Sequence, residues 1–141
     1  MNADFSSQLA LSAENIPAYL AWLAVMVILI ALFTFLYKLV TPYRELELIR
    51  AGNRAAAFSL GGTVIGFAIA LHTIASGSGS LLEMLMWGVI ALLCQVGVFL
   101  VAARLLGDLK AGIEADREGY GIFLGALSIA MGTVNAGALT Y

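Results

Sequence analysis

The chain has 141 residues, of which 62% are hydrophobic and 11% are charged, and its mean hydropathy is +0.97. Soluble domains carry charge on about a quarter of their residues, so this composition excludes a soluble globular protein. It also excludes a disordered chain, because disordered chains are poor in apolar residues. The length suits a single domain.

Four long stretches of the sequence carry no charge, at 15–37, 55–82, 84–103 and 119–141. A helix needs about 20 apolar residues to cross the hydrocarbon core of a bilayer, so each stretch is long enough for one crossing. We therefore predict an all-α fold, an integral membrane four-helix bundle. The helices are expected at about 17–40, 54–75, 81–105 and 119–140.

The segment 1–16 contains Asp4 and Glu14 but no Lys or Arg. A cleavable signal peptide begins with basic residues and has a short apolar core. We therefore interpret residues 17–40 as a membrane span, preceded by an extracytoplasmic segment. After the second span, residues 76–80 read Ser-Gly-Ser-Gly-Ser, which predicts a flexible polar turn.

All seven basic residues lie in two of the three connections between spans or at the span ends beside them. Basic connections remain in the cytoplasm, so both termini and the Ser/Gly turn are predicted to lie outside. Tyr37, Tyr43 and Tyr120 are expected at the inner membrane interface, which favours amphipathic rings. The basic residues are Lys38, Arg44, Arg50 and Arg54 in the first connection, and Arg104, Lys110 and Arg117 in the third.

The sequence resembles itself at a shift of 64 residues. Ile49-Arg50-Ala51 aligns with Ile113-Glu114-Ala115, and Leu60-Gly61 aligns with Leu124-Gly125. This pattern predicts two helical hairpins that form a parallel repeat. Chance similarity between two hydrophobic hairpins is the alternative.

The first basic connection contains signals for a short helix. Thr41-Pro42 suits an N-cap followed by Pro at the first helical position. Leu46 and Ile49 would then share one face of an amphipathic helix in the membrane interface. Gly52 is expected to end that helix.

The next helix and the second hairpin have related signals. Asn53 suits the cap of the helix that follows Gly52. In the second hairpin, Leu109 and Ile113 predict a similar short segment, and the pair Asp116-Arg117 stands where the first half has Gly52-Asn53.

Several short motifs in and around these connections point to a family. They are Thr41-Pro42-Tyr43, Glu45, the run from Leu48 to Asn53, Ala55-Ala56-Ala57, Trp87-Gly88, Gln95 and the run from Asn135 to Tyr141. Over about residues 17–141 the sequence resembles the YjfL-like family of small bacterial inner-membrane proteins, a domain of unknown function (number 350). The resemblance implies a bacterial multi-pass inner-membrane protein with two duplicated hairpins, and it supplies no established reaction or substrate.

Small residues recur at four-residue spacing in the second and fourth predicted helices. Small side chains allow helix backbones to approach closely within a bilayer. We predict that these stripes pack inside the chain, and a homo-oligomer face is the alternative. The glycines are Gly62, Gly66, Gly121, Gly125 and Gly132.

Glu83 is the first polar residue to weigh as a candidate ion or proton site, because ionisable groups inside membranes commonly mark function. It lies three residues after Ser80, at the start of the third predicted helix. The structural alternative is a capping box, in which Ser80 and Glu83 satisfy the N–H groups of the first turn.

Three further polar residues lie within predicted spans. Helical rise places His72 and Asn135 in the outer leaflet, at a depth comparable to that of Glu83. A cluster of the three would bind a cation or pass a proton, since His titrates near neutral pH. The alternative is that His72 reaches interfacial water and Asn135 bonds a neighbouring helix. Gln95 is expected to form an interhelical hydrogen bond, with a pore-lining role as the alternative.

Enzyme motifs are absent from the sequence, which has no phosphate-binding loop, HExxH or nucleophile elbow. One His and one Cys do not suffice for a typical zinc site. We therefore predict no catalytic residue, no cofactor and no metal. The basic connections are too short and too balanced by acids for nucleic-acid binding, but they suit contact with headgroups or with a cytoplasmic protein partner.

Two functional hypotheses follow. The first is a non-enzymatic protein that supports the envelope as a scaffold, by self-assembly or by docking a partner at its cytoplasmic segments. The second is a small proton- or cation-linked channel or transporter that uses Glu83, His72, Gln95 and Asn135. A continuous polar path through the bundle would favour the second.

Overall fold

The computed structural model describes residues 7, 9 and 12–139, and these contain no strand. Four of the helices are long and apolar enough to cross a membrane, which confirms the all-α prediction, and their ends lie within two residues of the predicted ones. Most of the segment 1–16 lies outside the described residues. The helices are α2 (Ile16–Val40), α3 (Glu45–Arg50), α4 (Arg54–Gly77), α5 (Leu81–Leu106), α6 (Leu109–Glu114) and α7 (Glu118–Ala138).

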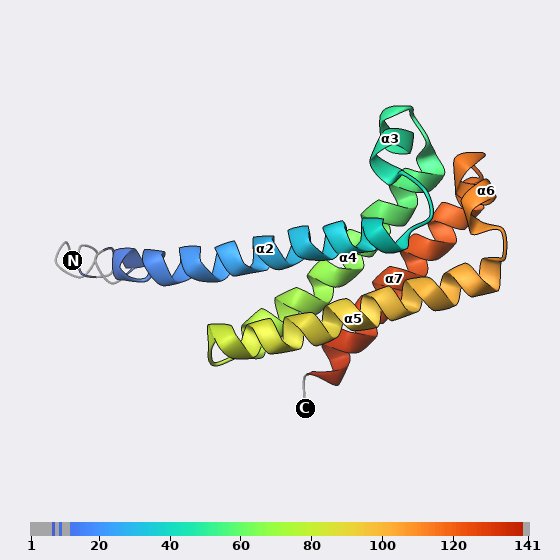
Figure 1. Cartoon of the computed structure of the whole chain (residues 1–141). Coiled ribbons are helices and arrows are strands. Elements are labelled where there is room, and N and C mark those ends of the chain that lie inside the picture. The colour runs from blue at the N-terminus through green and yellow to red at the C-terminus, as the bar shows by residue number, and fades with distance from the viewer. Residues whose placement is uncertain (1–6, 8, 10–11, 140–141) are drawn as a thin grey trace.

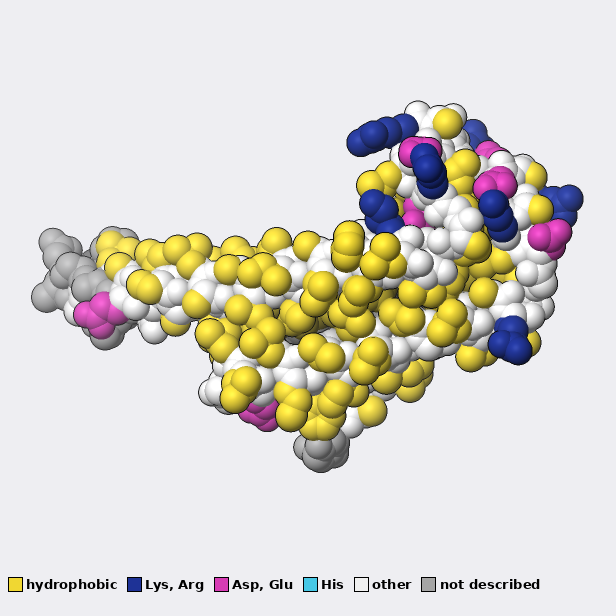
Figure 2. Space-filling model, in the orientation of Figure 1, with side chains coloured by type: hydrophobic (Ala, Val, Ile, Leu, Met, Phe, Trp, Pro, Cys, Tyr) yellow, Lys and Arg dark blue, Asp and Glu magenta, His cyan; other side chains and the backbone are white. Residues whose placement is uncertain are grey.

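The two short helices α3 and α6 lie together at one end of the bundle, and the first turns of α2 project beyond the other helices at the opposite end (Figure 1). Hydrophobic side chains cover the length of the long helices, whereas the visible Lys and Arg side chains gather at the α3–α6 end (Figure 2). This arrangement suits an apolar belt in lipid and a charged end in water. We call the opposite end of the bundle the far end.

The two halves of the chain repeat the same turn. The N–H of Gly52 donates to the Ile49 carbonyl oxygen at 2.9 Å. At a shift of 64 residues, the N–H of Asp116 donates to the Ile113 carbonyl oxygen at 3.0 Å. Gly52 and Asp116 have φ values of +88° and +53°, so both occupy the left-handed region that closes a helix. The internal repeat is therefore visible in the backbone, although the residues at the turn differ.

Polar side chains join the two turns across the pseudo-repeat. The side-chain amide of Asn53 donates to the Ile113 carbonyl oxygen at 2.7 Å, and the Asp116 carboxylate accepts from the Ala55 N–H at 2.9 Å. Asp116 thus caps the first turn of α4 from the other half of the chain. These bonds hold the starts of α4 and α7 next to each other.

Helices α4 and α7 then pack through their backbones. A Cβ added to Gly62 would meet the backbone of Gly125, one added to Gly132 would meet that of Gly66, and one added to Gly121 would meet the backbone of α4 at its start. All five glycines of the predicted stripes therefore lie at the α4–α7 contact, which removes side-chain bulk between these two helices.

One local prediction is wrong. Thr41 and Pro42 do not start the short helix, because α3 begins only at Glu45, after Arg44. Thr41 instead ends α2 in an extended conformation, with φ −71° and ψ 134°, as the residue before a proline favours. The chain then reverses, which buries Glu45 and leaves Leu46 exposed.

A matched pair of glycine substitutions tests the α4–α7 contact. Gly62→Val places a side chain against Gly125, whereas the neighbouring Gly61 has open space around it. We expect Gly62→Val to lower the free energy of unfolding by about 1–3 kcal/mol more than Gly61→Val, because overpacking costs that much and the change in helix propensity is the same. Unfolding in mixed micelles, followed by circular dichroism, measures the difference. Equal losses would contradict the contact.

Candidate functional site

A buried carboxyl group lies at the α3–α6 end of the bundle. Glu45, the first residue of α3, has an exposed fraction of 0%, and neither of its carboxylate oxygens has a hydrogen-bond partner among the described residues. Within 12–139 it is the single buried side chain of the Asp, Glu, Lys, Arg and His types. An unpaired buried charge is costly, so such a group tends to take up a proton instead.

The surroundings of Glu45 set its protonation. Burial raises the pKa of Glu45 to about 7, although the Thr41 hydroxyl and the Lys38 ammonium act in the opposite direction. Burial also raises the pKa of Tyr43, with further contributions from Tyr37 and Glu45. Glu45 therefore exchanges a proton near neutral pH, while Tyr43 keeps its own. Glu45, Lys38 and Tyr43 help to line a surface pocket of about 250 Å³.

A chain of buried polar groups leads from this end into the bundle. The hydroxyls of Tyr37 and Ser59 lie 3.1 Å apart, and Thr63 donates to the Ser59 carbonyl oxygen at 2.7 Å. The hydroxyls of Thr63 and Ser128 lie 3.2 Å apart, and the Gln95 amide donates to the Ser128 carbonyl oxygen at 3.1 Å. All five side chains are buried. We call these residues, which come from α2, α4, α7 and α5, the polar series.

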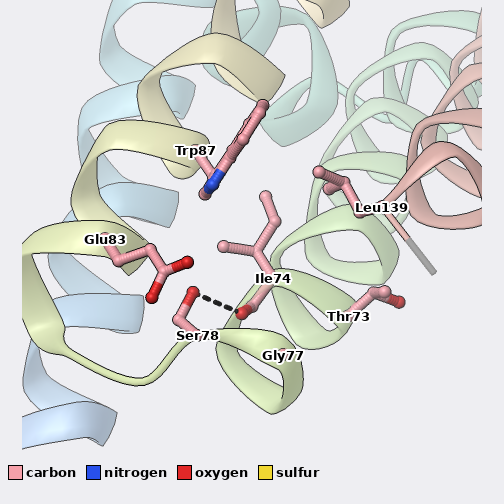
Figure 3. A pocket seen from close by; sticks show the side chains of 7 residues that line it. All are labelled: Thr73, Ile74, Gly77, Ser78, Glu83, Trp87 and Leu139. Atoms are coloured by element: carbon pink, nitrogen blue, oxygen red, sulfur yellow. Dashed lines mark hydrogen bonds between the residues drawn. The ribbon is translucent and has the colours of Figure 1, made fainter. Parts of the chain in front are cut away.

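Glu83 lies at the far end of the bundle. Ser80 accepts from the Glu83 N–H at 3.2 Å, and the Glu83 carboxylate accepts from the Gly79 N–H at 2.8 Å, so Glu83 takes part in a cap. It also lines a pocket of about 210 Å³ between α4, α5 and the end of α7. The Glu83 carboxylate, the indole nitrogen of Trp87 and the Ser78 hydroxyl point into this space (Figure 3). We call it the far-end pocket.

The other predicted polar residues lie in three different environments. His72 is exposed in a separate pocket between α2 and α4, which Tyr19 and Trp22 also line, so the structure does not bring it to the pocket of Glu83. Gln95 belongs to the polar series. Asn135 lies further along α7, with its side-chain nitrogen buried and without a hydrogen-bond partner among the described residues.

Comparison with known proteins gives a family. The model of the family described as Domain of Unknown Function (DUF350) matches residues 10–139. The chain belongs to this family. It is 30% identical over 128 residues to "UPF0719 inner membrane protein YjfL" of Escherichia coli (strain K12), which covers 91% of this chain and 97% of the relative. It is also 30% identical over 121 residues to "UPF0719 transmembrane protein YshE" of Bacillus subtilis (strain 168), covering 84% and 90%.

No solved structure matches the chain. The names of both DUF350 relatives state a membrane location and no reaction. Together with four helices that can span a bilayer, they make this chain a multi-pass inner-membrane protein. The activity must therefore be argued from its own residues.

The sequence interpretation found Gln95, whose amide forms the expected interhelical hydrogen bond, but missed the role of Glu45 and of the buried hydroxyls. Tyr37 and Tyr43, expected near the inner membrane interface, are buried inside the protein. Glu45 carried a signal that the internal repeat provides: at a shift of 64 residues its counterpart is Leu109, which is also buried. A carboxyl group at a position that the duplicated half fills with leucine indicates a role other than packing.

The pKa of Glu45 predicts a pH dependence of stability. Between its ordinary value of 4.5 and about 7, the folded state holds a proton that the unfolded chain has released. The free energy of unfolding should therefore fall by about 3 kcal/mol as the pH rises through this window, and change little above it. Thermal unfolding in detergent at a series of pH values measures this slope.

Two variants isolate the contribution of Glu45. Glu45→Leu, which copies Leu109, should flatten the slope between pH 4.5 and 7. Glu47→Gln is the control, because Glu47 is exposed and paired with Arg44, and it should keep the slope. A slope that survives in Glu45→Leu would show that another group causes it.

Proposed function

We propose that this DUF350 protein is a small proton-linked channel or transporter, with Glu45 as the proton acceptor at the α3–α6 end. One observation carries the proposal: a buried carboxyl group without a hydrogen-bond partner among the described residues lies at the same end of the bundle as Tyr37, the first residue of the buried polar series. Hydroxyl groups both donate and accept hydrogen bonds. The hydroxyl pairs Tyr37–Ser59 and Thr63–Ser128 can therefore each pass a proton by reorientation. In the proposed path, water bridges Glu45 to the first pair and the first pair to the second.

The internal repeat supports a functional role for the carboxyl group. Leu109 shows that this fold accepts an apolar side chain at the equivalent position. Replacing a buried charged group by a well-packed apolar one is often neutral or stabilising. Glu45 thus lowers the stability of the fold at a position where leucine would fit. Such destabilising ionisable groups are common where membrane proteins bind protons.

The proposal includes an orientation. All seven basic residues lie at the α3–α6 end or in the connections that lead to it, and basic connections favour the cytoplasm. We place α3, α6 and Glu45 in the cytoplasm, and both termini, including the segment 1–16, outside. The far-end pocket is then the outer pocket.

A second candidate is the scaffold hypothesis, with self-assembly or a cytoplasmic partner. An apolar groove of about 520 Å³ between α4 and α7 favours it, because Phe58 and Ile122 flank exposed small residues there. A second copy or an acyl chain suits such a surface equally, whereas the unpartnered Glu45 has no part in it. The proton-linked function is therefore the better supported.

Reconstituted vesicles test the proposed function. With a potassium gradient and valinomycin as the driving force, and an internal pH-sensitive dye, the native protein should carry protons faster than empty vesicles. Glu45→Leu and Glu45→Gln should lower this flux by about 100-fold, as loss of a positioned acid–base group does. Glu47→Gln should keep it. Native protein that carries no protons yet forms oligomers in the same vesicles would favour the scaffold instead.

Cysteine labelling tests the orientation. In a Cys94→Ala background, Gly79→Cys should react with an impermeant maleimide added to intact cells, because it lies in the turn before α5. Glu47→Cys should react only after the membrane is opened. Reaction of both from the same side would rule out four crossings in this orientation.

A further inference from the structure

Two unpaired polar atoms lie at the last residue of the polar series and beyond it. Gln95 has an exposed fraction of 1%, and its carbonyl oxygen has no hydrogen-bond partner among the described residues. The buried amide nitrogen of Asn135 has none either. A buried polar group left unpaired costs about 1–3 kcal/mol. One atom is an acceptor and the other is a donor, which suits hydrogen bonds to water.

Helix α5 connects Gln95 to the outer pocket. Glu83, Trp87, Ala91 and Gln95 follow each other at four-residue spacing and so lie along one ridge of the helix. The first two line the outer pocket, and the last belongs to the polar series. Ala91 is buried between Trp87 and Gln95. Its methyl side chain adds little bulk to this ridge.

Helix α7 supplies a matching row. Ser128, Asn135 and Leu139 are seven and four residues apart, which places them on one side of the helix. Ser128 accepts from Gln95, and Leu139 lines the outer pocket. At 1.5 Å per residue, Asn135 lies about 10 Å beyond Ser128 and about 6 Å before Leu139 along the axis. It stands between the end of the polar series and the pocket.

The charge of the outer pocket favours cations. Glu83 lines it, and none of the seven Lys and Arg residues lies in the outer half of any helix. Glu83 has no ion-pair partner among the described residues. A cleft lined by a carboxylate with no Lys or Arg beside it raises the local concentration of cations.

We propose that the outer pocket is the outer mouth of the proton path, where water and hydronium enter and pass Asn135 to reach Gln95. This inference rests on the proposed function and completes its route. Asn135 donates to water and Gln95 accepts from it, so the two amides orient a water file between pocket and polar series. The carboxylate of Glu83 attracts cations to the opening and excludes anions.

Flux measurements test the route. In the vesicle assay, Asn135→Leu and Glu83→Gln should each lower proton flux by about tenfold or more. Thr133→Val is the control, because Thr133 is an exposed polar residue of α7 that bonds its own helix, and it should keep native flux. Loss of flux in Glu45→Leu with native flux in Asn135→Leu and Glu83→Gln would overturn this route and leave the proposed function standing.

Chemical labelling tests the mouth independently of flux. In the Cys94→Ala background, Asn135→Cys should react from outside with a cationic methanethiosulfonate about tenfold faster than with an anionic one. Adding Glu83→Gln should bring the two rates together. If Gly79→Cys reacts and Asn135→Cys does not, the assignment of the outer pocket as the outer mouth is wrong, even if the native protein carries protons. Absence of flux in the native protein would overturn the proposed function.

Discussion

The close backbone contact between α4 and α7 is the constraint on which the rest of the structure depends. Glycines at this contact let the two helices meet without intervening side chains. Only at this short separation do the hydroxyls of Thr63 and Ser128 lie 3.2 Å apart. The same glycines that pack the bundle therefore bring polar groups from both halves of the chain into one series.

Duplication explains why the bundle is symmetric in its backbone and asymmetric in its chemistry. Gly52 and Asp116 close equivalent turns, and each half reaches across to satisfy the other through Asn53 and Asp116. The polar groups do not repeat. At a shift of 64 residues, Glu45 corresponds to Leu109, and Ser59 corresponds to Phe123. One half thus supplies the protonatable end, while the other completes the packing around it.

The sequence was sufficient for the membrane spans, because the absence of charge over about 20 residues is a strong physical signal. It also pointed to the close-packed glycines and to Gln95. It could not show that Glu45 is buried, since burial results from the reversal after Pro42 and from the packing of α3. Ser59 and Thr63 read as ordinary helix residues until α7 places Ser128 opposite them. The site is formed by tertiary contacts, and local sequence patterns do not predict such contacts.

The depth of Glu45 fits the proposed role of a group that gains and loses a proton. A carboxyl group at the centre of the bilayer would hold its proton too tightly, because desolvation raises its pKa without opposition. Near the end of α2, the Thr41 hydroxyl and then the Lys38 ammonium partly offset that effect, and the pKa rises only to about 7. The carboxyl group is then buried enough to hold a proton near neutral pH, while it lies at the charged end of the bundle. A buried acid at a helix junction satisfies both demands of the proposed function.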